Sequence, residues 1–162
     1  MSEILSIMVQ DKLSTPTGTS GLGRRGEELA ARYLIDNGYR LVLSNFKVPV
    51  GRNSKGVQVT GEIDLIALDG DTLCFIEVKT RRSDEFAPII TAVDLRKQRQ
   101  ITRTARTYLR IFGIHGVKYR FDVVTVLIAR GLSPKIKLIK NFWTEASFKK
   151  RNWYHNEWFP AS

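Results

Sequence analysis

Residues 71–80 read DTLCFIEVKT, which has the composition of a buried β-strand apart from two charged side chains. Successive side chains of a strand face opposite sides, and both faces here are apolar except at Glu77 and Lys79. The stretch therefore predicts a central strand that is covered on both sides. Because burying a carboxylate or an ammonium group costs several kcal/mol, Glu77 and Lys79 must find compensating partners inside the fold.

The segments around this strand alternate between helical and extended patterns. Helical spacing of apolar residues covers 23–37 and about 90–112, and extended Val- and Ile-rich stretches cover 40–50, 57–67, 119–128 and 135–139. The tip GRNSKG joins the first two stretches into a long hairpin, and Pro49 indicates an outer strand. The order αβββαββ predicts an α/β domain in which helices flank a central mixed β-sheet.

The composition sets the class of protein. The chain has 162 residues, of which 43% are hydrophobic, enough for one domain with a core. Its single cysteine, Cys74, excludes a disulfide framework or a Cys-based zinc site and indicates the cytoplasm. No run approaches the roughly 20 apolar residues of a membrane span, so we expect no membrane association.

Acidic side chains are predicted to gather around Glu77. If Asp69-Gly70 is a two-residue hairpin turn, Glu62 lies opposite Glu77 and Asp64 lies diagonal to it. Three carboxylates beside Lys79 would repel one another unless a cation lay among them, and oxygen ligands suit Mg²⁺ or Mn²⁺. The alternative is a structural network in which Lys79 neutralises one acid and the others are solvated.

The pattern of the first predicted helix favours the metal site over the structural network. Glu27 falls on its apolar side, between Ala31 and Leu34, whereas the adjacent Glu28 points outward among arginines. One of two neighbouring glutamates therefore faces the sheet, where it would join the other acids.

Basic residues predict a nucleic-acid partner. The 26 Lys and Arg against 16 Asp and Glu give a net charge of +10, which attracts polyanions. One side of the second helix carries Arg96, Arg99, Arg103, Arg106 and Arg110. A phosphate backbone would relieve their repulsion, although a solvated face is the alternative. Arg81 and Arg82, with Arg52 and Lys55 at the hairpin tip, would extend this surface, whereas Gln98 points inward as a site-lining residue would.

Two further patterns have mainly structural interpretations. Asp122 is expected to be a strand-end partner of Arg120. Three tryptophans are interleaved with basic residues after position 141, and they would either dock onto the domain or a second subunit, or stack on unpaired bases.

Five blocks, GRRGEELAARYLIDNGY, GEIDLI, FIEVKTRR, the Lys97-Gln98 pair and RFDVVTV, occur in this order. In these blocks the chain resembles the bacterial YraN family of predicted endonucleases, which belongs to the PD-(D/E)xK superfamily and is distantly related to archaeal Holliday junction resolvases. The resemblance covers about residues 22–140 and implies a restriction-endonuclease-like fold. We expect a nuclease-like domain over 21–141, between a flexible N-terminal tail, 1–20, and an aromatic and basic C-terminal extension, 142–162.

The resemblance also implies roles for individual residues. Asp64 and Glu77 would be metal ligands, Lys79 would position or polarise the attacking water, and Glu27 would be an accessory acid. Glu62 and Gln98 match further motif positions that line the site.

The expected activity is that of a Mg²⁺- or Mn²⁺-dependent endodeoxyribonuclease, a hydrolase acting on DNA rather than RNA, in particular on branched or structured DNA. Paired cuts in a junction need two sites, so such an enzyme would act as a homodimer. The alternative is a noncatalytic nucleic-acid-binding protein on a nuclease-like fold.

Overall fold

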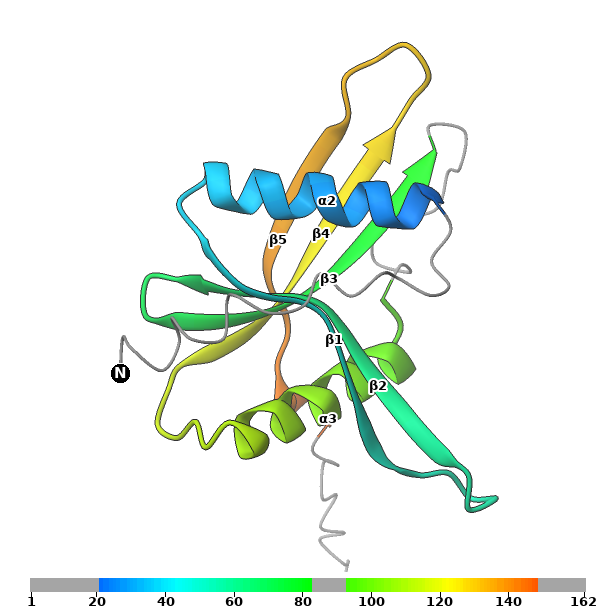
Figure 1. Cartoon of the computed structure of the whole chain (residues 1–162), viewed down its shortest axis with the longest axis vertical. Helices are drawn as coiled ribbons and strands as arrows, with labels where there is room; N and C mark the ends of the chain where they lie inside the picture. The colour runs from blue at the N-terminus through cyan, green and yellow to red at the C-terminus, as the bar shows by residue number, and fades with distance from the viewer. Residues whose placement is uncertain (1–20, 83–92, 149–162) are drawn as a thin grey trace, which may run out of the picture.

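Two helices cover opposite faces of a five-stranded sheet in the computed structural model, which describes residues 21–82 and 93–148 (Figure 1). The helices are α2 (Gly21–Asp36) and α3 (Leu95–Ile111), and a 3₁₀ turn, η2 (Glu145–Phe148), follows the last strand. The sheet order is β1 (Arg40–Arg52), β2 (Gln58–Asp69), β3 (Thr72–Arg82), β4 (Tyr119–Ile128) and β5 (Lys135–Trp143).

All neighbouring strands are antiparallel except β3 and β4, which are parallel and are joined across α3. The structure therefore confirms the predicted α/β class, the mixed sheet and the order αβββαββ.

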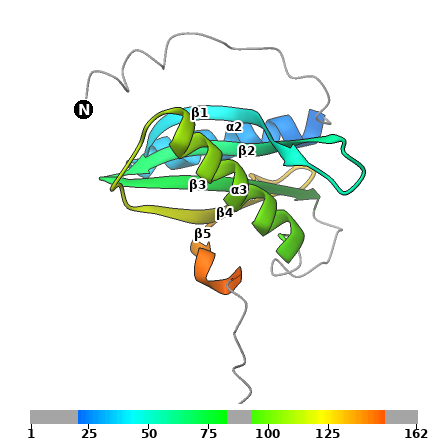
Figure 2. The ribbon, with the colours of Figure 1, turned by 90° about the horizontal axis from the view of Figure 1, so that it is seen from below.

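The central strand β3 contributes to two separate cores, as its sequence predicted. On one face Cys74 and Ile76 pack in the core beneath α2, and on the other Phe75 packs in the core beneath α3. All three residues have no exposed surface. In Figure 2, α3 lies across the strands on the side nearest the viewer, and α2 lies on the far side of the sheet. Glu77 and Lys79 therefore belong to a strand that is enclosed on both sides.

The turn before β3 differs from the prediction. Asp69 pairs with Thr72, so the two turn residues are Gly70 and Asp71 rather than Asp69 and Gly70. Gly70 has φ +62°, and glycine is the residue that accepts this conformation at the first position of a two-residue turn. Asp69 stays in the strand because its Oδ2 pairs with Arg120 Nη2 at 2.7 Å. The predicted register of β2 on β3 was therefore wrong.

Two element boundaries also differ. Helix α3 was expected from about residue 90, but it begins at Leu95 because the side chain of Asp94 caps it, accepting from the backbone N of Lys97 at 2.8 Å. Residues 90–92 lie outside the described part. Strand β5 was expected to end at residue 139 but continues to Trp143, whose ring stacks on Phe121 with centroids 4.9 Å apart. At least one tryptophan of the C-terminal segment is therefore a core residue.

Strands β2 and β3 separate halfway along their length. Their pairing ends at Leu65 and Ile76, after which β2 continues with β1 and β3 continues with β4. Figure 1 shows the β1–β2 hairpin turning away from β3 beyond this point. We call this separation the strand fork, and the acidic motif residues lie next to it.

Candidate active site

Asp64 lies at the strand fork, where the ladder between β2 and β3 ends. Its Oδ2 accepts a hydrogen bond from the backbone N of Val78 at 2.8 Å, so the side chain replaces a strand-to-strand bond. The residue is only 9% exposed. Burial, and next the charge of Glu77, raise the pKa of Asp64 to about 8. The fold therefore holds this carboxylate where its charge is unfavourable unless a cation lies nearby.

Glu77 is the second buried carboxylate at the fork. Its Oε1 lies 3.2 Å from Lys79 Nζ and 3.6 Å from Lys97 Nζ. Its Oε2 is buried and has no hydrogen-bond partner in the described part of the chain. Buried carboxylate oxygens nearly always have a partner, and an orphan often indicates an ion or water that belongs there.

Glu27 approaches these acids from α2. It is half-buried, and its pKa is raised by burial and then by the charges of Glu62 and Glu77. The preceding Gly26 determines how close the helix comes: a Cβ there would lie 1.7 Å from Thr80 Oγ1 of β3. The structure thus places Glu27 on the sheet-facing side, where helical periodicity predicted it.

Glu62 does not lie opposite Glu77 as predicted, although its charge acts on Glu27. Its Oε1 lies 3.4 Å from Lys47 Nζ on β1, and 37% of its side chain is exposed. The expectation that Glu62 sits opposite Glu77 was wrong because the turn is shifted, which brings Asp64 to Glu77 instead. Among residues 21–82 and 93–148, no three His, Cys, Asp or Glu side chains are arranged to hold a metal ion together.

The N-terminal turn of α3 supplies a second lysine that sequence reasoning did not assign to the site. Lys97 faces Glu77 and also lowers the pKa of Asp64. The only sequence signal for this role was that Lys97 belongs to the Lys97-Gln98 pair, one of the five blocks shared with the YraN family. The adjacent Gln98 is half-buried, and its Nε2 donates to the backbone O of Val93 at 2.8 Å. Gln98 therefore holds the segment that leads into α3.

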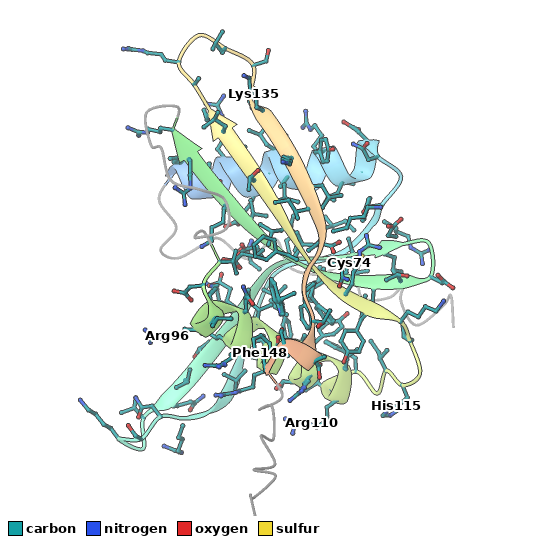
Figure 3. All side chains as sticks on the ribbon, turned by 180° about the vertical axis from the view of Figure 1, so that it is seen from behind. Cys74, Arg96, Arg110, His115, Lys135 and Phe148 are labelled. Atoms are coloured by element: carbon teal, nitrogen blue, oxygen red, sulfur yellow. The ribbon has the colours of Figure 1, made fainter. Side chains whose placement is uncertain are left out.

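The predicted arginine row is exposed along the whole of α3. Figure 3 shows Arg96 and Arg110 at opposite ends of this helix. Two members have partners in the C-terminal turn: Arg106 Nη2 lies 2.5 Å from Glu145 Oε2, and Arg99 lies over the Phe148 ring at 5.7 Å.

The remaining basic candidates lie on other elements. Arg81 and Arg82 are the last two residues of β3, where Arg81 is half-buried and Arg82 is exposed. Arg52 and Lys55 are exposed at the tip of the β1–β2 hairpin.

Asp122 has the structural role that was predicted for it. It has no exposed surface, and its carboxylate accepts from Arg120 Nε at 2.9 Å and from the backbone N of Asn141 at 2.8 Å. Arg120 also donates to Tyr39 Oη and to Asp69. This network joins β2, β4 and β5.

The α/β fold thus brings the motif carboxylates Asp64 and Glu77 together at the strand fork, next to two lysines. The chain belongs to the Uncharacterised protein family UPF0102, whose model matches residues 26–126. This confirms the resemblance to the YraN family.

Several relatives support the assignment. A UPF0102 protein of Chlorobium chlorochromatii (strain CaD3) is 42% identical over 139 residues, covering 82% of this chain and 99% of its own length. A UPF0102 protein of Desulfosudis oleivorans is 41% identical over 119 residues, covering 74% of this chain and 86% of its own.

A solved structure, the crystal structure of SSO0001, is similar with a TM-score of 0.35 and 20% identity. The match covers 78% of this chain, which spans about half of that protein. Within the described residues, neither helix is long and apolar enough to cross a membrane.

The buried charge of Asp64 predicts a pH-dependent stability. In the absence of divalent ions, the folded protein keeps a proton on Asp64 up to a pH of about 8, whereas the unfolded chain loses it near 3.8. Stability should therefore fall as the pH rises through this window. Asp64→Asn keeps an acceptor for Val78 and should stabilise the protein by about 2 kcal/mol at pH 8.

Thermal unfolding in EDTA at pH 4 and pH 8 would measure this effect. The gain from Asp64→Asn should be small at pH 4, and the exposed Asp71→Asn variant should show little change at either pH. Equal gains for Asp64→Asn at both pH values would contradict the assignment.

Proposed function

We propose that the protein is a metal-dependent nuclease that hydrolyses phosphodiester bonds of DNA at the strand fork. The observation that carries this proposal is Glu77 Oε2, a buried carboxylate oxygen without a hydrogen-bond partner in the described part of the chain, held beside Asp64, which is also buried. Burial and mutual repulsion make the negative charges of these two carboxylates unfavourable, and a bound cation would offset that cost. Membership in UPF0102 supports this class without specifying a substrate.

The residues at the fork fit a Mg²⁺ or Mn²⁺ ion. Such ions bind through one or two carboxylates and complete their coordination with water and substrate phosphate, so Asp64 and Glu77 suffice as protein ligands. When bound, the ion would supply the charge that activates water and stabilises the phosphate.

The remaining groups have roles of their own. Lys79, which is held against Glu77, would place a fixed positive charge beside the phosphate and the attacking water. Lys97 would add a second positive charge from α3. Glu27, whose raised pKa favours proton uptake, would serve as an accessory acid that exchanges a proton with solvent.

We propose further that the substrate is branched or structured DNA. The enzyme would act as a homodimer with two sites, in the cytoplasm. The homodimer follows from the need for paired cuts in a junction.

A second candidate is a noncatalytic nucleic-acid-binding protein. The observation that favours it is the pairing of Glu77 Oε1 with both Lys79 and Lys97, which compensates one oxygen without a metal ion. In that case the acids would hold the two arms of the fork in place.

Cleavage assays separate these candidates. End-labelled single-stranded, duplex, flap and four-way-junction DNA, with matched RNA, would be incubated with the protein in Mg²⁺, Mn²⁺ or EDTA. We expect DNA cleavage that requires the metal ion and is strongest on one of the structured substrates. Tight binding with no cleavage of any substrate in either metal would instead support the binding protein.

A further inference from the structure

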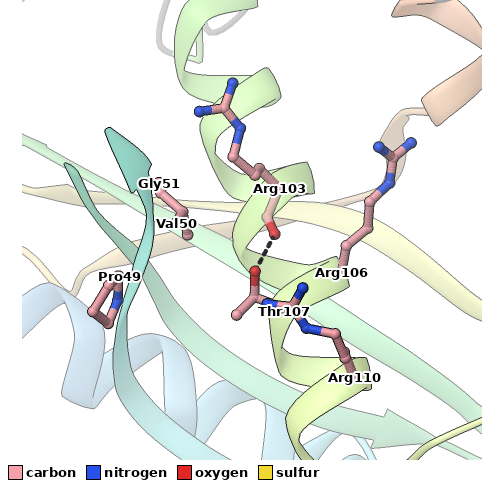
Figure 4. Close-up of a pocket in the computed structure, with 7 residues that line it drawn as sticks. All are labelled: Pro49, Val50, Gly51, Arg103, Arg106, Thr107 and Arg110. Atoms are coloured by element: carbon pink, nitrogen blue, oxygen red, sulfur yellow. Dashed lines mark hydrogen bonds between the residues drawn. The ribbon is translucent and has the colours of Figure 1, made fainter. Parts of the chain in front are cut away.

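A groove of about 490 Å³ lies between the outer strand β1 and α3 (Figure 4). Residues 49–51 of β1 form one wall, and the other consists of Arg103, Arg106, Thr107 and Arg110. The groove lies on the α3 face of the β1–β2 hairpin. It does not include the acidic residues at the fork.

The two walls differ in chemistry. Arg103 and Arg110 have no carboxylate partner among the described residues, and they lie seven residues apart, about 10 Å along the helix. They are far enough apart to hold different phosphates. The opposite wall has Pro49, which has no N–H, followed by Val50 and Gly51, so it offers mainly apolar surface. A row of guanidinium groups facing an apolar wall suits a strand with charged phosphates and apolar sugar and base surfaces.

The strand β2, which carries Asp64, runs beside the groove. A Cβ at Gly61 of β2 would lie 2.0 Å from Thr104 Oγ1 of α3 and 2.8 Å from Val50 Cγ1 in the groove wall. Strand β2 therefore packs closely against both β1 and α3 at Gly61. Asp64 is three residues further along β2, about 10 Å away. A strand lying in the groove would therefore approach the fork.

The middle arginine of the groove already has an anionic partner. Glu145 of η2 bridges Arg106 Nη2, at 2.5 Å, and Tyr119 Oη, which donates to its Oε1 at 2.7 Å. Its carboxylate carries the charge that a phosphate would bring to Arg106. Substrate binding at this position must therefore displace or share Glu145.

We propose that the groove between β1 and α3 binds one strand of nucleic acid and leads it to the acidic site, and that Glu145 competes with the strand for Arg106. Arg103 and Arg110 act in this proposal as phosphate-binding residues. The direction toward the fork rests on the proposed nuclease function, but binding in the groove needs no cleavage.

Binding measurements on the full chain test the groove directly. Affinity for a labelled single-stranded DNA and for the same sequence as duplex would be measured in EDTA over a range of salt concentrations, in the uncleaving Asp64→Asn background. Arg103→Gln and Arg110→Gln should each weaken binding about fivefold to tenfold and reduce the slope of log affinity against log salt by nearly one. Arg32→Gln, which removes an exposed arginine from α2, is the matched control and should change neither value.

Glu145→Gln tests the competition. It should strengthen binding severalfold by releasing Arg106, and adding Arg106→Gln should remove the gain. Circular dichroism would confirm that each variant is folded. An affinity equal to or lower than that of the parent would overturn the role of Glu145.

If Arg103→Gln and Arg110→Gln bound nucleic acid as Arg32→Gln does, the proposal that the groove binds a strand would be wrong. Absence of cleavage by the wild type, with these binding effects intact, would overturn the nuclease function and leave the groove in place. The two failures are therefore distinguishable.

Discussion

Replacing Asp64 with asparagine should abolish metal-dependent cleavage, lowering the rate by at least about 10³-fold. Asparagine has nearly the shape of aspartate and retains an acceptor for the backbone N of Val78. What it removes is the negative charge that would hold the metal ion with Glu77. The variant should nevertheless be more stable at pH 8 than the wild type, because a buried charge has been removed.

Single-turnover cleavage of the preferred substrate, with wild type, Asp64→Asn and Asp71→Asn prepared in parallel, measures this effect. Asp71 is exposed in the turn before β3, so its variant should cleave at the wild-type rate. Binding by Asp64→Asn should be unchanged or tighter, since less negative charge faces the phosphates. Substantial cleavage by a folded Asp64→Asn protein would remove Asp64 from the site.

Replacing Gly26 with alanine should destabilise the protein by about 2 to 3 kcal/mol. Within a helix this change ordinarily stabilises by about 1 kcal/mol, because alanine is the better helix former. Here the new Cβ would lie 1.7 Å from Thr80 Oγ1 and 2.7 Å from its Cβ, so α2 must move away from β3. Because Glu27 follows directly, cleavage should fall as well.

Chemical denaturation of Gly26→Ala and Gly21→Ala provides the comparison. Gly21 lies in the same helix with nothing within 4 Å of the position of a Cβ, so its variant should be as stable as the wild type or slightly more so. A Gly26→Ala protein that matched Gly21→Ala would show that the approach of α2 to β3 is not tight.

The local patterns of the sequence predicted the parts of the site that depend on one element. The alternation in β3 placed Glu77 on a buried strand, and the helical periodicity of α2 placed Glu27 toward the sheet. Both inferences need only the side-chain period of a single strand or helix. They were correct because apolar neighbours on the same element decide which face is buried.

Relations between elements were harder to predict. The sequence Asp69-Gly70-Asp71 contains two dipeptides that can form a two-residue turn, and the choice between them moves every residue of β2 relative to β3. Pairing of Asp69 with Arg120, a residue far along the chain, decides that choice. The error then assigned Glu62 the position beside Glu77 that belongs to Asp64.

Contacts of α3 were missed for a similar reason. The prediction that the helix starts near residue 90 did not use Asp94 as its N-cap. It therefore did not show which way the side chain of Lys97 points. The pairing of Arg106 with Glu145 spans 39 residues and depends on β5 continuing to Trp143, which no local pattern indicates.

The tip of the β1–β2 hairpin is closed by bonds within itself. Asn53 Oδ1 accepts from the backbone N of Lys55 and of Val57, and Arg52 Nη1 donates to the backbone O of Gly56. The hairpin can therefore gain or lose residues in pairs on each strand, which keeps every inward side chain facing inward. Such changes would alter how far the hairpin reaches over a bound strand without moving Asp64, so evolution can adjust substrate reach and chemistry separately.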